Sequence, residues 1–297
     1  MGGMDGAGAQ QTSALIEALA SRVTRDRDGR LVCAVLASVA QVHDLLHELR
    51  PTPEEWRDLI GFLTEVGHAT DARRQEWVLL ADVIGASTLL EDLHCTRPGG
   101  ATPNTLSGPF YRADAPELKN GADISRDGLG ERLEVSGQIR DLAGDPVPGA
   151  MVDVWQANSF GVYENQQPDL QPEFNLRGRF VADASGAFRF LTVRPCGYCL
   201  PEDGPVGRLM ARIGVKLERP AHLHFRVSAP GHDTLTTHVY DRSDPAIGRD
   251  ALFGVKPELL GDFRPVPGAD SAAFSLSVTF VLAPIDGAVA PTRVPHT

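Results

Sequence analysis

The sequence is organised around three stretches, GVYENQQPD (residues 161–169), RPCGYC (194–199) and ERPAHLHF (218–225). They place Tyr163 and Tyr198 ahead of a His-x-His pair, His222 and His224. Side chains alternate between the two faces of a β-strand, so residues i and i+2 point the same way. We therefore expect both imidazoles to point into one space, while the residue that follows each histidine packs on the opposite face.

Two phenol oxygens and two imidazole nitrogens make a four-ligand metal set. A free phenol has a pKa near ~10, so a tyrosinate at neutral pH requires a strongly Lewis-acidic ion, which favours Fe(III) over Zn²⁺ or Mg²⁺. From the residues alone, a simpler interpretation stays open. A His-x-His pair is often two polar residues on a solvated strand face, and a tyrosine near a turn is often a half-buried aromatic with a wet hydroxyl.

Cys196 and Cys199 flank Tyr198 in a Cys-x-x-Cys motif. A redox role would place this motif at a helix N-terminus after a strand. Here Pro195 precedes it and LPEDGP follows it, which favours a loop. Tyr198 is therefore a better candidate for chemistry than either cysteine.

Length and charge limit the class of protein. A chain of 297 residues can form one large domain or two smaller ones. The net charge of −11 argues against nucleic acid or an anionic membrane surface as the main partner. We expect no membrane span and no signal peptide, hence a cytoplasmic protein, and a disordered tail at residues 1–11.

The pattern from about residue 12 to residue 95 is helical. Apolar residues recur at helical spacing and form one stripe: Val35, Leu36, Val39, Val42, Leu45, Leu46 and Leu49. A second helix is expected to begin at TPEE, where Thr52 caps, Pro53 takes the first helical position and Glu55 completes a capping box. A third is expected from Thr70 or Asp71 to Leu90.

The pattern changes after a loop at residues 96–127 that is rich in Gly, Pro and Thr. Short β-like runs then alternate with turn residues, which is typical of a β-sandwich or barrel. The runs are LEVSGQI (133–139), AMVDVWQA (150–157), GRFVAD (178–183), AFRFLTV (187–193), AHLHFRVS (221–228), LTTHVY (235–240) and FSLSVTFVLA (274–283). The segment after Ala283 is expected to be irregular.

Several ordered motifs resemble the intradiol ring-cleavage dioxygenases, and the resemblance runs from about Thr12 to Val266. They are VDVWQANSFGVYENQQPD (152–169), RPCGYCLPEDGPVG (194–207) and RPAHLHFRVSAPG (219–231). SGPFY (107–111) and DALFGVK (250–256) are similar to the hydroxyquinol branch of that family. The resemblance implies an α+β fold with a helical dimerisation region at 12–106 and a mainly antiparallel β-sandwich catalytic domain at 107–297.

The resemblance also implies a metal site and two catalytic roles. Tyr163, Tyr198, His222 and His224 would bind one Fe(III) per subunit. Tyr198 would leave the metal to take a substrate proton, and Arg219 would stabilise charge on the ring. The residues alone equally permit a surface ion pair between Arg219 and Glu218.

The implied substrate is an aromatic diol or triol, cleaved with O₂. The pocket residues implied by the resemblance are Leu79, Asp82, Ser107, Gly108, Pro109, Phe110, Leu200, Pro201, His238 and Leu252. His238 occupies a position where the hydroxyquinol branch has His and the catechol branch has Gln, which favours hydroxyquinol and maleylacetate as substrate and product. Asn158-Ser159 and Ser107 depart from the hydroxyquinol pattern and keep open a catechol 1,2-dioxygenase that forms cis,cis-muconate.

Two further expectations follow. The resemblance implies a homodimer formed through the N-terminal helices, with a phospholipid at the interface. An alternative from another class is a β-sandwich binding module in which the tyrosines and histidines are structural.

Overall fold

The computed structural model describes residues 14–23, 29–71, 74–94, 97–268 and 272–285. The chain divides into two compact units, residues 1–68 and 69–297. The tail expected at residues 1–11 and nearly all of the segment after Ala283 lie outside the described residues.

The first unit is helical, as predicted. Its main helices are α2 (Arg30–Leu49) and α3 (Pro53–His68), preceded by a short helical segment at 14–20. The capping box at the start of α3 is confirmed, because Thr52 N donates to Glu55 Oε2 at 2.8 Å and Glu55 N donates to Thr52 Oγ1 at 3.2 Å.

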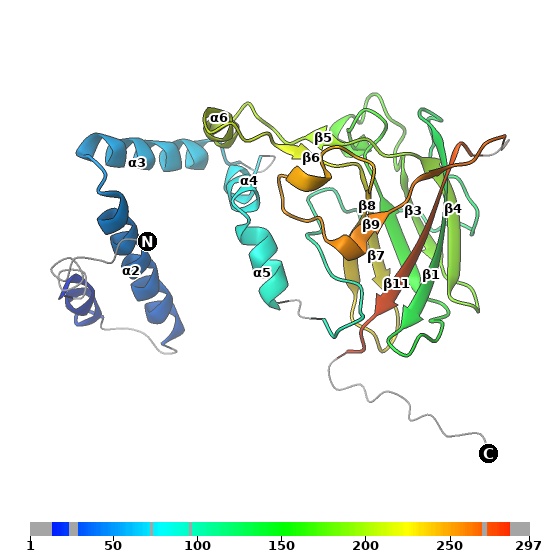
Figure 1. Ribbon diagram of the computed structural model, residues 1–297, viewed down its shortest axis with the longest axis horizontal. Helices are drawn as coiled ribbons and strands as arrows, with labels where there is room; N and C mark the ends of the chain where they lie inside the picture. Colours follow the sequence, from blue (N-terminus) through cyan, green and yellow to red (C-terminus); the bar gives the residue numbers. More distant parts are fainter. Residues whose placement is uncertain (1–13, 24–28, 72–73, 95–96, 269–271, 286–297) are drawn as a thin grey trace, which may run out of the picture. The chain divides into compact units, whose positions relative to one another are not determined.

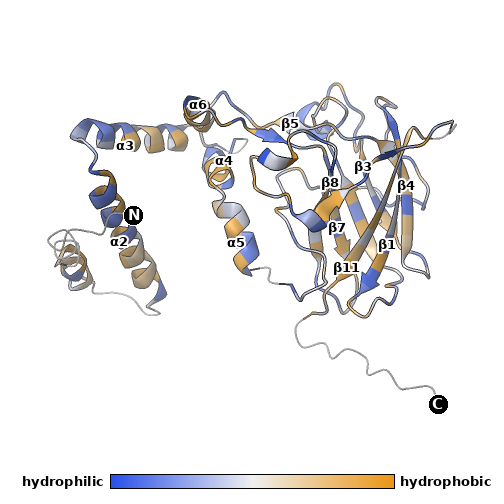
Figure 2. Cartoon of the chain, in the orientation of Figure 1, coloured by the Kyte–Doolittle hydropathy of each residue, from blue (hydrophilic) through white to orange (hydrophobic). Residues whose placement is uncertain are grey.

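The apolar stripe of helix α2 is exposed or half-buried among the described residues. Figure 2 shows hydrophobic residues, coloured orange, along α2. None of the residues of α2 is buried, and Leu31, Val35 and Leu45 are among its exposed apolar side chains. Its length and a mean hydropathy of 1.2 make it the one helix of the described residues with the dimensions of a membrane span. That evidence is weak, since a helix whose apolar face packs against a partner has the same composition.

The expected helix from residue 70 to residue 90 is wrong in its bounds. The structure has two helices there, α4 (Glu76–Val83) and α5 (Ala86–His94). Gly85 separates them with φ 77°, a left-handed conformation that ends a helix and that glycine adopts without strain. Asp71 forms a turn before α4 by accepting a bond from Arg74 N.

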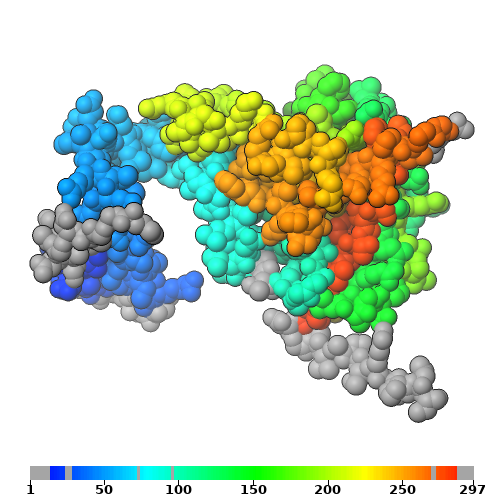
Figure 3. Space-filling model, in the orientation of Figure 1, coloured from blue at the N-terminus to red at the C-terminus, as the bar shows by residue number. Residues whose placement is uncertain are grey.

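Helices α4 and α5 belong to the same compact unit as the strands, residues 69–297. Polar anchors hold them there. The buried Glu76 carboxylate accepts a hydrogen bond from Val206 N at 3.0 Å, at the start of α6 (Pro205–Arg212), a helix that the sequence pattern did not predict. On α5, Thr88 Oγ1 donates to Leu252 O at 2.6 Å. Figure 3 shows the orange segment around residue 250 directly against these cyan helical residues.

The strands form a sandwich of two sheets, as expected (Figure 1). The five-stranded sheet contains, in spatial order, β3 (Arg177–Val181), β2 (Met151–Trp155), β7 (His222–Ser228), β8 (Leu235–Asp241) and β9 (Leu260–Gly261). The four-stranded sheet contains β10 (Arg264–Pro265), β11 (Phe274–Leu282), β1 (Arg132–Asp141) and β4 (Ala187–Val193). Pairing is mainly antiparallel, but β1–β11 and β8–β9 are parallel.

The core lies between the two sheets. In β1, burial alternates residue by residue, which is the pattern of a strand with one face on the core. The inner faces contribute Val135, Phe188 and Phe280 from one sheet and Val152 and Phe225 from the other. This closed core leaves the outer face of the five-stranded sheet free to carry polar residues.

Candidate metal centre and active site

One row of paired residues crosses the outer face of the five-stranded sheet. Arg177 of β3 pairs with Trp155 of β2, Trp155 pairs with His224 of β7, and His224 pairs with His238 of β8. Directly paired residues point to the same face of a sheet, so the register brings one guanidinium, one indole and two imidazoles together.

The neighbouring row on the same face adds His222 and its partner Tyr240. The residues that follow the two histidines, Leu223 and Phe225, are fully buried in the core between the sheets. The prediction that alternation points both imidazoles into one space is therefore confirmed.

Three of the four expected ligands meet at one buried point. His222 Nε2 lies 3.2 Å from His224 Nε2, and Tyr163 OH lies 2.9 Å from the same His224 atom. All three residues are at most 2% exposed. The half-buried Tyr198 stands edge-on to Tyr163 with ring centroids 6.0 Å apart, and its ring centroid is 5.7 Å from that of His222.

The proton positions fit a metal ligand set. His222 Nδ1 lies 2.7 Å from the carbonyl oxygen of Pro220, which only accepts, so the imidazole proton is on Nδ1. Nε2 then directs its lone pair towards His224 and Tyr163. Metal-binding histidines characteristically hold their second ring nitrogen in this way.

The electrostatics of the site disfavour charge on every one of its imidazoles. Burial, then the positive charge of Arg219, lowers the pKa of His222 to about 3. Burial, then neighbouring His222, holds the pKa of His224 well below its usual range. Both imidazoles are neutral at pH 7, which is the form that binds metal.

Tyr163 is the residue whose ionisation needs a cation. Burial, followed by the nearby Tyr198, raises the pKa of Tyr163 well above that of a free phenol, while Arg219 and Arg177 oppose the shift. A phenol so placed becomes a tyrosinate only when a strong cation lies beside its oxygen. The donor set therefore fits a Lewis-acidic metal ion.

The segment that carries Tyr198 is not the start of a helix. It is a two-residue strand, β5 (Tyr198–Cys199), which pairs with β6 (Glu218–Arg219). Gly161 lets this segment approach the Tyr163 turn, because a Cβ there would lie 2.6 Å from Tyr198 Cβ. Cys196 and Cys199 are free and exposed. This placement gives the cysteines none of the helix-terminus geometry of a redox motif.

Arg219 is buried beside the expected metal ligands, not paired at the surface. Its Nε lies 3.1 Å from Asp250 Oδ1, and its Nη2 lies 3.1 Å from the Tyr240 hydroxyl. Burial opposes its charge, but Tyr240, Tyr198 and Asp250 outweigh burial, so the pKa of Arg219 is raised above its ordinary value. The alternative ion pair with Glu218 is not formed, since Glu218 pairs with Arg249 at 2.7 Å.

Helix α4 presents Asp82 towards this guanidinium. Burial raises the pKa of Asp82, while a hydrogen bond with Ser87 and the charge of Arg219 act in the opposite direction. Leu79, three residues earlier, is half-buried on the same side of the helix.

The loop predicted to run beside the substrate lies against the ligands. Gly108 has φ 70°, and a Cβ on it would stand 3.6 Å from His224 Cε1. Phe110 stacks on Tyr163 with ring centroids 4.2 Å apart. The other expected pocket residues divide into Ser107, Pro109 and Pro201, which are exposed, and Leu200, which is half-buried.

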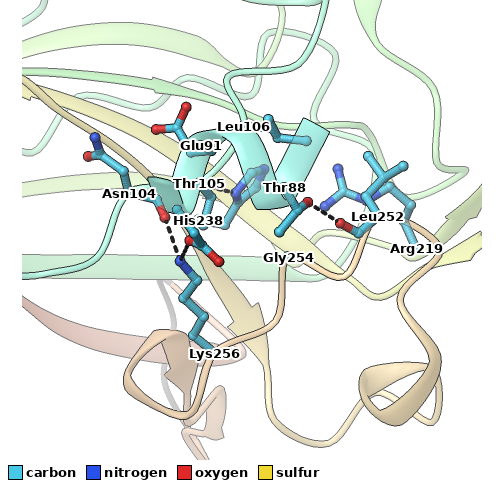
Figure 4. A pocket seen from close by; sticks show the side chains of 11 residues that line it. Thr88, Glu91, Asn104, Thr105, Leu106, Arg219, His238, Leu252, Gly254 and Lys256 are labelled. Atoms are coloured by element: carbon cyan, nitrogen blue, oxygen red, sulfur yellow. Dashed lines mark hydrogen bonds and ion pairs between the residues drawn. The ribbon is translucent and has the colours of Figure 1, made fainter. Parts of the chain in front are cut away.

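His238 and Leu252 meet in a small pocket next to Arg219 (Figure 4). The His238 ring centroid is 4.1 Å from that of His224, and Thr105 Oγ1 bonds its Nδ1. Its Nε2 is buried without a hydrogen-bond partner. At the outer end of the pocket, Lys256 Nζ pairs with Asp92 at 2.6 Å and donates to Asn104 O.

Several site residues were not identified from the sequence. Tyr240 could have been, because it follows His238 by two positions in LTTHVY and so shares its face. Trp155, which stacks on His224 at 4.7 Å, and Asp250, which pairs with Arg219, are placed only by sheet register and loop path.

Two family models match this chain. Residues 106–284 match a family model described as Dioxygenase, and residues 28–102 match one described as Catechol dioxygenase N terminus. A hydroxyquinol 1,2-dioxygenase of Rhizobium sp. (strain MTP-10005) is 46% identical over 270 residues, 91% of each chain.

Two solved structures resemble the chain. A hydroxyquinol 1,2-dioxygenase from Pseudomonas putida DLL-E4 superposes with a TM-score of 0.87 at 34% identity, covering 94% of this chain and 99% of that one. The wild-type catechol 1,2-dioxygenase of Acinetobacter radioresistens gives a TM-score of 0.79 at 27% identity and covers 97% of each chain.

Proposed function

Because this chain belongs to the intradiol ring-cleavage dioxygenase family, we propose that it cleaves hydroxyquinol (benzene-1,2,4-triol) with O₂ to maleylacetate, using one Fe(III) per subunit. The observation that carries the proposal is the buried meeting point of Tyr163, His222 and His224, where both imidazoles are neutral and the phenol needs a cation to ionise. Family membership removes the alternative of a binding module without catalytic activity.

Tyr163, Tyr198, His222 and His224 are the proposed iron ligands. When bound, ferric iron supplies the Lewis acidity that acidifies the diol and draws electron density from the ring. Of the two phenols, Tyr198 is half-buried on a two-residue strand, whereas Tyr163 is fully buried under Phe110. Tyr198 is therefore the residue whose ionised oxygen would accept a proton from the bound diol and become a neutral phenol.

Arg219 is the proposed electrostatic catalyst. It is a buried cation fixed by Asp250 and Tyr240, so its charge is positioned before the reaction and costs no reorganisation. Asp82 faces it from α4, and Leu252 lies beside it. We place the aromatic ring between these residues and the loop from Ser107 to Phe110, with Leu79, Leu200 and Pro201 at its edges.

Hydroxyquinol is favoured over catechol by the similarity to the two hydroxyquinol 1,2-dioxygenases named above and by His238 at the proposed metal site. The departure at Asn158 carries little weight, because its Oδ1 accepts bonds from Phe160 N and Val162 N at 2.9 and 3.1 Å. Asn158 thus shapes the turn that leads into Tyr163. Ser107, small and exposed, is the residue that favours the second candidate, a catechol 1,2-dioxygenase that forms cis,cis-muconate.

The test combines an iron assay, a visible spectrum and oxygen uptake on protein purified in air. We expect about one iron per chain, a broad tyrosinate-to-iron band, and faster O₂ uptake with hydroxyquinol than with catechol. Faster uptake with catechol would replace the substrate and keep the iron site. A colourless protein that stays colourless after ferric loading would overturn the iron site itself.

The N-terminal helices are the proposed dimer interface. Their apolar stripe includes Val35, Val42 and Leu49, which are exposed in the described part of the chain. We expect light scattering to give twice the chain mass of 31.9 kDa, and Val42→Asp to halve it. Organic extraction followed by mass spectrometry tests for a phospholipid at this interface, and cell fractionation tests the proposed cytoplasmic location.

A further inference from the structure

A buried ion pair stands immediately behind Tyr163. Arg177, 1% exposed, pairs through Nε with Glu164 Oε2 at 2.6 Å. Glu164 is itself 4% exposed and directly follows Tyr163 in the chain. Removing two charges from water has a large desolvation penalty, which only good geometry and further hydrogen bonds can offset. The positions of these two side chains are therefore closely determined.

The same guanidinium also holds the substrate loop. Arg177 Nη1 donates to the carbonyl oxygen of Phe110, whose ring stacks on Tyr163. One side chain from β3 therefore fixes both the residue after Tyr163 and the residue whose ring covers it. The planar fork of arginine bonds two acceptors in a fixed relative position, which a single ammonium does less well.

The Tyr163 backbone is tied to the same turn. Tyr163 N donates to Gln166 Oε1 at 2.9 Å, where the helical turn η1 (Glu164–Gln166) begins. Arg112 Nη1 lies 3.1 Å from Glu164 Oε1, so the carboxylate bridges two guanidiniums. The positive charge of Arg177 also acts to lower the pKa of Tyr163 and the pKa of His224.

We propose that Arg177 is a positioning residue, which fixes the Tyr163 phenol at the metal site by holding Glu164 and the Phe110 carbonyl together. This inference rests on the proposed iron-dependent function. In this role Arg177 slows the release of iron by positioning Tyr163, and it does not contact the substrate.

The chain offers a closely matched control on the same strand. Arg179 points to the same face of β3, pairs with Asp153 Oδ1 at 2.6 Å and donates to a backbone carbonyl, that of Ala113, at 2.8 Å. Its partners do not adjoin Tyr163. Arg177→Met and Arg179→Met therefore remove equivalent contacts, and only the first acts on the phenol.

The experiment measures the rate of iron release to a chelator and the visible band of each iron-loaded variant. We expect Arg177→Met to release iron roughly 10- to 100-fold faster than wild type and to shift the tyrosinate band, as outer-shell changes at metal sites do. Arg179→Met should match wild type in both. Arg177→Lys, which keeps the charge but not the fork, should recover part of the iron retention.

Folding failure is handled by a second variant. Arg177→Met leaves the buried Glu164 carboxylate paired with Arg112 but not with a second cation, so Arg177→Met/Glu164→Gln, which removes that carboxylate charge, is measured alongside it. The double variant should fold and still release iron quickly. Equal iron release and an unshifted band in wild type and the double variant would overturn the positioning role, whereas absence of the band in wild type would instead overturn the iron site.

Discussion

Tyr163→Phe is expected to lose iron, colour and activity together. Removing the phenol oxygen deletes the buried one of the two proposed tyrosinate donors and leaves His222, His224 and the half-buried Tyr198 as ligands. We expect iron affinity to fall by more than the ~100-fold that marks the upper end for outer-shell substitutions. Iron content after dialysis against a chelator and the absorbance of the visible band measure the loss.

Tyr111→Phe is the matched control for this substitution. Tyr111 lies near the site, with its ring 5.0 Å from Trp155, but its hydroxyl makes long contacts to Asp153 and Arg226 at 3.4 and 3.3 Å. It should keep iron and colour. A Tyr163→Phe protein that retained stoichiometric iron and an unchanged band would remove Tyr163 from the ligand set.

Arg219→Met is expected to leave the iron in place and slow the reaction. The guanidinium is not a ligand, so the visible band should persist, but the fixed charge for the attacked ring is lost. Removing one preorganised donor of this kind costs roughly 10²–10³ in kcat. Steady-state oxygen uptake should show kcat and kcat/KM falling by similar factors, the mark of an interaction made in the transition state.

Arg219→Met is also expected to lower the free energy of unfolding, and a second substitution at Asp250 separates this effect from the effect on kcat. Arg219→Met leaves the Asp250 carboxylate buried and unpaired, which costs roughly 3–5 kcal/mol. Arg219→Met/Asp250→Asn should recover most of the stability in thermal unfolding but none of the lost kcat. Recovery of both would mean that Arg219 acts by supporting the fold.

Arg249→Met is a control for loss of an arginine in the same region. Arg249 is 53% exposed and pairs with Glu218 at the surface, so its removal should change stability by less than about 1 kcal/mol and leave kcat unchanged. A loss of kcat equal to that of Arg219→Met would point to a general effect of charge.

Local pattern determined much of the fold. Short β-like runs separated by turn residues located the seven long strands of the described residues, and the capping box at Thr52 placed the start of α3. It also determined that His222 and His224 share a face, because the alternation of side chains is a property of any strand. The resemblance of the motifs to the family then supplied the proposed ligand residues and the domain bounds. The experiments above test whether those residues bind the metal.

Features without a local signal required the tertiary structure. The start of helix α6 depends on a contact with a distant residue, because Val206 N donates to the buried carboxylate of Glu76. Sheet register alone aligned Arg177, Trp155, His224 and His238 in one row. Loop closure alone brought Asp250 to Arg219, 31 residues apart in sequence.

The physical reason for this division is the range of the interactions. Strand alternation, capping and glycine conformation are set by neighbours within a few residues, so the sequence determined them. Which buried charge meets which counter-charge depends on how strands pair and where loops return, and only the tertiary structure decided that Arg219 faces Asp250 instead of Glu218, and that Arg177 stands behind Tyr163.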